Sequence, residues 1–187
     1  MNLTPLGIDG AWLAESPIWN DERGFFREWF RLTDVQAKTG IDFSIQQANI
    51  SQSKRGVIRG IHYSLAPKGQ AKWVTCAEGS IQDVIVDLRQ TSKTFCKSIS
   101  IKLESQKGLS VLLAPGLGHG FLSLEERTTV SYLLSTEYVP SLEYGVNPLD
   151  ENLNIDWETD GIQVNLSLKD ELSPSLESLK LSKLLPK

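Results

Sequence analysis

Segments in which apolar and polar residues alternate dominate the middle of the chain. They are rich in β-branched and aromatic residues, and turns containing glycine or proline separate them at intervals of roughly 8–12 residues. Many short strands at this spacing are typical of a sandwich or barrel, so the pattern predicts an all-β chain that forms a closed or double-sheet barrel. The predicted strands are FFREWF (25–30), SIQQANIS (44–51), GVIRGIHYS (56–64), AKWVTCAEG (71–79), SIQDVIVDL (80–88), KSISIKLE (97–104), LSVLLAP (109–115) and TTVSYLLSTEY (128–138).

Two segments carry helical signals instead. In residues 31–40, Thr33 is a candidate N-cap, Gln36 completes a capping box, and Gly40 stands where a helix would end. Near the C-terminus, Ser173 is a candidate N-cap with Pro174 at the first helical position, and leucines with partial helical spacing follow. The sequence therefore predicts a short helix within 31–40 and another at about 173–185, packed on the outside of the barrel.

Length and charge narrow the class of protein. A chain of 187 residues can form one full hydrophobic core, so we expect a single domain over residues 1–187. The formal net charge of −4 argues against nucleic acid as a partner, although a few clustered cations could still hold a small anion. No stretch approaches the ~18 apolar residues of a membrane helix, and the N-terminal segment lacks a signal-peptide pattern, so we expect a cytoplasmic protein that does not bind membranes.

The two cysteines have ordinary surroundings. Cys76 and Cys96 both lie in strand-like segments and show no CxxC spacing. We therefore expect both to be small buried hydrophobic residues rather than parts of a disulfide, metal or redox site.

Several polar residues interrupt the apolar strands or lie at their ends. Taken singly, each has an ordinary structural interpretation, because a lysine or arginine in a strand usually reaches solvent and a tyrosine usually packs its ring. Both histidines follow glycine-containing segments, RGIH and PGLGHG, where the backbone can turn sharply or approach a ligand closely. Taken together, these residues are candidates for lining a ligand cavity: Arg59, His62, Lys72, Asp83, His119 and Tyr132.

A metal site and a proton-transfer site make different demands on these residues. Metal-binding β-barrels commonly use two histidines one residue apart, a carboxylate and a further histidine, and a chain with two histidines cannot supply that set. A different set completed by carboxylates is the less favoured alternative, so the sequence predicts no metal. Proton abstraction from carbon instead needs a base, a cation for the enolate oxygen and an acid, and His62, Lys72 and Tyr132 are residues of those types.

Eight segments, in a fixed order over roughly residues 5 to 175, carry a resemblance to one family. They are DERGFFRE (21–28), QQANIS (46–51), GVIRGIHY (56–63), AKWV (71–74), DVIVDLR (83–89), PGLGHGF (115–121), SYLLSTEY (131–138) and LSLKD (166–170). With these segments the chain resembles the dTDP-4-dehydrorhamnose 3,5-epimerases, which are metal-free cupin barrels that act on a 4-keto-6-deoxyhexose carried by thymidine diphosphate. The resemblance implies a cupin-type double-stranded β-helix, or jelly-roll barrel, with a few short peripheral helices.

The resemblance also implies roles for matching positions. His62 would be the base, oriented by Asp170; Tyr132 would be the acid, and Lys72 would stabilise the oxyanion. No cofactor is implied, because the substrate's own ketone acidifies the neighbouring hydrogens. Tyr138 would stack on the thymine, and aromatic faces and arginines do suit a nucleobase and a pyrophosphate. The other implied substrate contacts are Arg23, Glu28, Gln47, Asn49, Arg59, His119, Glu143 and Lys169.

A homodimer is a further implication of the resemblance. Arg23 and Glu28 would reach into the site of the partner subunit. The sequence itself offers only the segment DERGFFREWF, whose charges around an aromatic cluster equally suit a protected strand edge.

The sequence leaves the outcome of the reaction open. In YLLSTEYVPSLEYGVNPLD the chain lacks a basic residue after the tyrosine and a Trp-Asn-Asp-Pro turn near 147–150, both of which many family members have. This departure leaves open whether C3, C5 or both are inverted. The alternatives are a C5-only or C3-only epimerase for an antibiotic deoxysugar, a cupin-like ketoisomerase, and a non-catalytic sugar-binding β-barrel.

Overall fold

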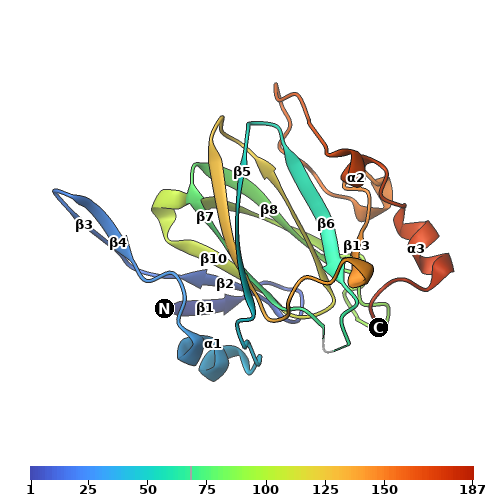
Figure 1. Ribbon diagram of the computed structural model, residues 1–187, viewed down its shortest axis with the longest axis horizontal. Helices are drawn as coiled ribbons and strands as arrows, with labels where there is room; N and C mark the ends of the chain where they lie inside the picture. The colour runs from blue at the N-terminus through green and yellow to red at the C-terminus, as the bar shows by residue number, and fades with distance from the viewer. Residues whose placement is uncertain (68) are drawn as a thin grey trace.

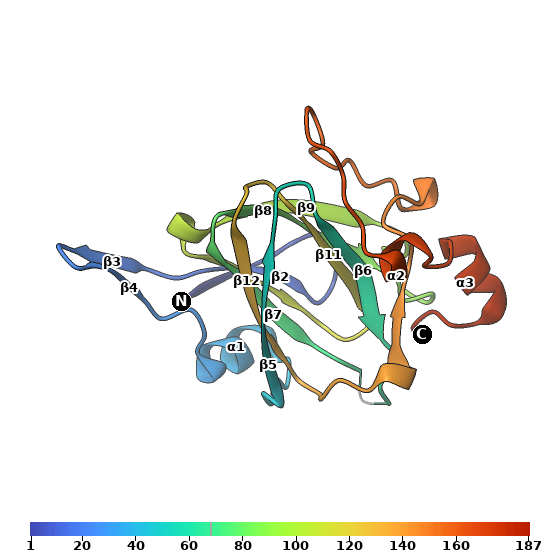
Figure 2. The ribbon, with the colours of Figure 1, turned by 45° about the horizontal axis from the view of Figure 1, so that its top comes forward.

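The strands form two antiparallel sheets that face each other, together with a separate hairpin (Figures 1 and 2). The structure is a computed structural model that describes residues 1–67 and 69–187. In spatial order, the six-stranded sheet consists of β1 (Asn2–Pro5), β2 (Ala11–Glu15), β10 (Leu109–Leu113), β7 (Lys72–Glu78), β12 (Thr128–Leu134) and β5 (Gln47–Ser53). The five-stranded sheet consists of β13 (Glu143–Gly145), β6 (Ile58–Ser64), β11 (Leu117–Ser123), β8 (Ser80–Asp87) and β9 (Ser98–Glu104). The predicted all-β jelly-roll barrel is confirmed.

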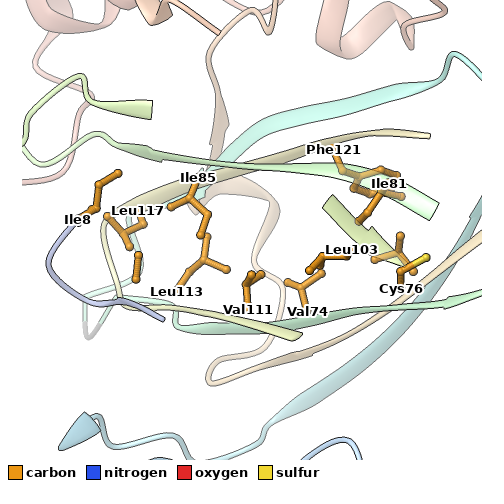
Figure 3. Close-up of a cluster of buried hydrophobic side chains, with 12 residues drawn as sticks. Ile8, Val74, Cys76, Ile81, Ile85, Leu103, Val111, Leu113, Leu117 and Phe121 are labelled. Atoms are coloured by element: carbon orange, nitrogen blue, oxygen red, sulfur yellow. The ribbon is translucent and has the colours of Figure 1, made fainter. Parts of the chain in front are cut away.

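The hydrophobic core lies between the two sheets. Alternate residues of a strand point to opposite faces, so β7 and β8 each send every second side chain inward. Figure 3 shows the resulting cluster, in which Val74 and Cys76 of β7 meet Ile81 and Ile85 of β8. Asp83, which lies between these two isoleucines, therefore also points into the barrel. The interior is thus apolar over most of its length, and Asp83 places a charged side chain within it.

The C-terminal segment covers the outer face of the five-stranded sheet. Leu176 and Leu179 of α3 (Leu176–Ser182) pack against the outward side chains of β6 and β8, so all eight residues of β8 are buried. The predicted C-terminal helix is confirmed, but it is shorter, and the prediction of Ser173 as its N-cap is wrong. Ser175 is the N-cap, because its side chain accepts the amide of Ser178. Pro174 lies outside the helix, and its carbonyl accepts the amide of Asn147. A further helix, α2 (Leu168–Glu171), precedes α3.

The helix α1 (Leu32–Thr39) packs near the outer face of the six-stranded sheet, where Val35 joins a cluster with Trp73 and Leu112. Gly40 ends the helix with φ 68°, as predicted. The prediction of Thr33 as N-cap is wrong, because the helix begins two residues earlier than that cap implies, and Arg31 occupies the cap position without a side-chain bond.

The hairpin of β3 (Ile18–Asp21) and β4 (Gly24–Arg27) projects away from both sheets (Figures 1 and 2). Its aromatic side chains Trp19, Phe25 and Phe26 are 53%, 59% and 68% exposed. The strand predicted at 25–30 corresponds to β4, which ends earlier than predicted, at Arg27. Short 3-10 helices span Ser105–Lys107, Pro140–Leu142 and Glu151–Leu153.

The cysteines are both free, and Cys76 is buried in β7 as predicted. The prediction of a buried strand residue at position 96 is wrong: Cys96 lies in a turn before β9 with φ 66° and is partly exposed. Among the described residues, no helix has the length and apolar character needed to cross a membrane.

Candidate active site

His62 and Asp170 are joined by a hydrogen bond of 2.6 Å between Nε2 and Oδ1. The histidine comes from β6 and the carboxylate from α2, where Ser167 caps the helix by accepting the amide of Asp170. Asp170 is almost fully buried, which by itself raises its pKa, but the bond from His62 and the smaller contributions of Ser167 and Lys169 hold the pKa below its ordinary value. The carboxylate therefore stays ionised and fixes the imidazole with Nδ1 directed away from it.

A second pair, His119 and Asp83, lies beside the first. Nε2 of His119 is 2.7 Å from Oδ2 of Asp83, and the carboxylate is fully buried. His119 stands directly opposite His62 in the pairing of β11 with β6, so both imidazoles are on the inner face of the sheet. Oδ1 of Asp83 makes no hydrogen bond with any of residues 1–67 and 69–187. A buried carboxylate oxygen without a hydrogen-bond partner is uncommon in folded proteins.

Lys72 reaches this cluster from the opposite sheet. Its side chain is buried, and Nζ donates to the carbonyl of His62 at 3.2 Å. Burial lowers the pKa of Lys72 to about 8, while the charges of Glu143 and Asp83 partly offset that effect. The ammonium is therefore mostly charged at neutral pH.

Tyr132 approaches the cluster from β12. Burial raises its pKa, and a hydrogen bond from Asn49 together with the charge of Arg59 partly offsets the increase. Arg59 lies on β6 and donates to Ser53 Oγ at 3.0 Å and to the carbonyl of Gln52 at 3.1 Å. The phenol therefore faces a site that contains both a cation and an amide donor.

These side chains surround one cavity. Seven of the residues implied by the resemblance line it, and they come from β5, β6, β7, β12, β13, α2 and the segment that follows β12. The lining residues are Asn49, His62, Gln70, Lys72, Tyr132, Leu134, Tyr138, Glu143, Tyr144 and Lys169. Gln47 lies beside this group and donates from Nε2 to Asn49 Oδ1 at 2.9 Å.

Gln70 is a cavity residue that the sequence analysis did not single out. It is buried, and its amide donates to Thr136 Oγ1 at 3.1 Å and to Glu143 Oε1 at 3.4 Å. The second of these bonds connects Gln70 to Glu143 at the wall of the cavity. The sequence signal that could have identified Gln70 is its position directly before the AKWV segment, in which β7 begins.

Arg23 and Glu28 lie away from this cavity within their own chain. Arg23 is at the tip of the hairpin and pairs with Asp21, and Glu28 pairs with Arg31, all with exposed side chains. Within residues 1–67 and 69–187, no three His, Cys, Asp or Glu side chains converge as ligands for a metal ion.

Comparison with known proteins identifies the family. The model of the dTDP-4-dehydrorhamnose 3,5-epimerases matches residues 5–178. The chain belongs to this family. Its members are isomerases, so the protein is an enzyme of that class.

Individual relatives cover nearly the whole chain. A dTDP-4-dehydrorhamnose 3,5-epimerase of Mycobacterium tuberculosis is 40% identical over 100% of this chain and 93% of its own length. A dTDP-4-dehydro-6-deoxyglucose 3-epimerase of Streptomyces bikiniensis is 43% identical, over 97% of this chain and 92% of its own. The solved structure of a 3,5-epimerase from Legionella pneumophila in complex with dTDP-4-keto-L-rhamnose matches with a TM-score of 0.92 at 34% identity, over 100% of this chain and 97% of that chain. This epimerase family therefore contains relatives of similar identity that differ in how many carbons their names say they invert.

Proposed function

We propose that the protein epimerises a dTDP-4-keto-6-deoxyhexose at C3 and C5, converting dTDP-4-dehydro-6-deoxy-D-glucose into dTDP-4-dehydro-L-rhamnose. The observation that carries the proposal is the convergence of the His62–Asp170 pair, Lys72 and Tyr132 on one cavity. A carbon acid beside a ketone needs a base, a cation near the carbonyl oxygen and a separate proton donor, and the cavity contains one of each.

The base in this mechanism is His62. Its Nε2–H donates to Asp170, which leaves Nδ1 to take the proton from the carbon next to the C4 ketone. The electron pair of the broken C–H bond forms a double bond to C4, and the π pair of the ketone moves onto its oxygen, which gives an enolate. Asp170 stabilises the imidazolium that forms, because it is buried and already ionised.

The enolate needs positive charge and then a proton. Lys72 is the buried cation of the cavity, and it donates to the new oxyanion. Tyr132 then transfers its hydroxyl proton to the carbon from the other side, the ketone re-forms, and the configuration is inverted. The phenolate and the imidazolium return to their starting states by proton exchange with water, after which the second carbon can react.

The nucleotide half of the substrate is assigned to the rim. Tyr138 is half exposed beside the cavity and presents its ring to the thymine. Lys169 lines the same cavity, and we assign the pyrophosphate to Lys169 and to Arg59, whose charge acts on Tyr132.

The site is completed by a second subunit in this proposal. The projecting hairpin carries three exposed aromatic side chains, and Arg23 at its tip lies outside the cavity of its own chain. An apolar hollow on the six-stranded sheet, lined in part by Phe25, Trp29 and Ile50, offers a surface for the partner. A homodimer would cover these apolar residues and bring Arg23 and Glu28 to the neighbouring site.

Deuterium wash-in monitored by NMR tests the proposal. With dTDP-4-dehydro-6-deoxy-D-glucose in heavy water, we expect deuterium at both C3 and C5, together with the L-configured product. His62→Asn should abolish exchange while circular dichroism shows an unchanged fold. Exchange at one carbon only would replace the proposal with a single-site epimerase, and movement of the keto group would indicate a ketoisomerase. Binding without exchange at either carbon would indicate a sugar-binding barrel.

A further inference from the structure

A line of hydrogen bonds runs from the rim of the cavity to Asn49, the cross-strand neighbour of Tyr132. The backbone amide of Tyr138 donates to Gln47 Oε1 at 2.8 Å. Gln47 Nε2 in turn donates to Asn49 Oδ1 at 2.9 Å. Asn49 stands directly opposite Tyr132 in the pairing of β5 with β12, and both side chains line the cavity.

The direction of this line is fixed at its outer end. A backbone N–H can only donate, so Gln47 must turn its oxygen toward Tyr138 and its NH2 group toward Asn49. Asn49 must then present its oxygen to Gln47, which leaves its own NH2 group for Tyr132. The group of Asn49 available to Tyr132 is therefore a donor, and a hydrogen bond from it to the phenol oxygen would leave the hydroxyl proton free to point into the cavity.

Strand geometry supports this arrangement. Gln47 and Asn49 are two residues apart on β5, so both side chains leave the same face of the strand. Their cross-strand partners on β12 are Leu134 and Tyr132, two residues that also line the cavity. The two polar side chains of β5 thus lie on the same face as Tyr132, with Asn49 directly beside it.

We propose that Gln47 and Asn49 are positioning residues that aim the Tyr132 proton into the cavity and stabilise the phenolate left after proton transfer. This role goes beyond substrate contact, and it rests on the proposed function, in which Tyr132 is the acid. A hydrogen-bond donor stabilises an oxygen most when that oxygen carries a negative charge. The line from the Tyr138 amide through Gln47 and Asn49 to Tyr132, which we call the relay, therefore affects the reprotonation step. Proton abstraction by His62 does not depend on it.

Two variants of Gln47 test the relay. Gln47→Glu keeps an acceptor for the Tyr138 amide but presents a second acceptor to Asn49, so the Asn49 amide should rotate and turn its oxygen toward Tyr132. Gln47→Met is neutral and removes both bonds, leaving the Asn49 amide without a fixed orientation. Gln46→Glu makes the same charge change at an exposed neighbouring residue and is the matched control.

The decisive measurement is the ratio of deuterium exchange with retention to deuterium exchange with inversion. Loss of the acid lets His62 return a proton to the face it came from, so exchange continues while inversion falls. We expect the ratio to rise roughly tenfold in both Gln47 variants, toward the value for Tyr132→Phe, and to stay unchanged in Gln46→Glu. A mere substrate contact would raise KM and slow both outcomes equally. An unchanged ratio in Gln47→Met would overturn the relay, even if Gln47→Glu changed it, because charge alone would then explain the effect.

Titration of Tyr132 separates the relay from the proposed function. The chain has four tyrosines, so ring-labelled protein gives few NMR signals, and Tyr132→Phe assigns the relevant one. Arg59 and Glu143 are the charged groups that act on this phenol, and both remain in every variant. Both Gln47 substitutions should raise the Tyr132 pKa, and Gln46→Glu should not. An unshifted titration would overturn the relay, whereas absence of all exchange in the unmodified enzyme would overturn the proposed function.

Discussion

His119 lies directly opposite His62 across the pairing of β11 with β6, and each imidazole is hydrogen-bonded to a different buried carboxylate. The His62 side chain is 36% exposed and lines the cavity, whereas that of His119 is 12% exposed. The two pairs therefore differ in access to substrate and solvent. The more open pair is suited to exchanging a proton, and the more enclosed pair is suited to holding a fixed charge distribution around Lys72.

Asp170→Asn should slow deuterium exchange by about 10²- to 10⁴-fold, the range typical for loss of a general base. The amide cannot stabilise the imidazolium, and it can present its NH2 group to His62 and so change the tautomer of the ring. The measurement is NMR exchange at saturating substrate, with circular dichroism as the folding check. An exchange rate near that of the unmodified enzyme would remove Asp170 from the mechanism.

Ser167→Ala tests whether the N-cap of α2 supports Asp170 in its catalytic position and ionised state. Ser167 caps α2 by accepting the amide of Asp170, and Ser175 caps α3 by accepting the amide of Ser178. Loss of either cap should cost about 1 kcal/mol of the free energy of unfolding, measured by urea denaturation. We expect Ser167→Ala also to slow exchange and Ser175→Ala to leave it unchanged. Equal rates in the two variants would show that the cap contributes stability alone.

Lys72→Met should stabilise the fold while it abolishes activity. Burial lowers the pKa of Lys72 from 10.5 to about 8, so the unfolded chain binds more protons between these two values. The lysine therefore destabilises the native state fully below pH 8, and stability recovers as the pH rises toward 10.5. Its replacement should raise the free energy of unfolding by up to about 3 kcal/mol at pH 7.

Urea denaturation at pH 7 and pH 10 checks this expectation. The gain from Lys72→Met should shrink at the higher pH. Lys102→Met, at an exposed lysine, is the control and should change stability little at either pH. A loss of stability in Lys72→Met at pH 7 would contradict the conclusion that the buried charge of Lys72 destabilises the fold.

Asp83→Asn should move the high-pH limit of activity to lower pH. The charge of Asp83 raises the pKa of Lys72, so its removal lets burial lower that pKa further, and the ammonium is lost earlier as the pH rises. The pH dependence of the exchange rate measures the shift. Asp87→Asn provides the comparison, because Asp87 is a buried carboxylate of the same strand that pairs with Arg89. It should lower stability without moving the pH limit, and equal shifts in both variants would exclude a specific effect of Asp83.

The sequence predicted the strands whose alternation is regular and missed those that depend on tertiary contacts. The segment LGHGFLS of β11 contains two glycines, which weaken a strand signal. In the fold, a Cβ on Gly60 would lie 2.5 Å from the Cα of Gly120, and Gly60 has φ 137°. Close approach of β6 and β11 thus requires glycine in both strands, and no local pattern reveals that the two glycines face each other.

Prediction of the site was limited in the same way. Physical reasoning could propose His62, Lys72 and Tyr132 as residue types suited to proton transfer, but Asp170 was identified only through resemblance to a family. It lies 108 residues from His62, and α2, which brings it there, has only four residues. Asp83 appeared as a carboxylate in an apolar strand, and its partner His119 became evident only from the pairing of β8 with β11.

Mixing two inactive variants tests whether the hairpin of one subunit serves the site of the other. His62→Asn removes the base, and Arg23→Ala removes the hairpin cation, which lies outside the cavity of its own chain. If Arg23 acts in the partner's site, a mixed dimer has one site with both residues intact. Random exchange of subunits at equal concentrations makes about half of the dimers mixed, so about a quarter of the normal site activity should return. Co-expression with two affinity tags provides the mixed dimer directly, and Arg31→Ala, near the hairpin, replaces Arg23→Ala as the control. Absence of recovery in the purified mixed dimer would place Arg23 in the site of its own chain or outside the site altogether.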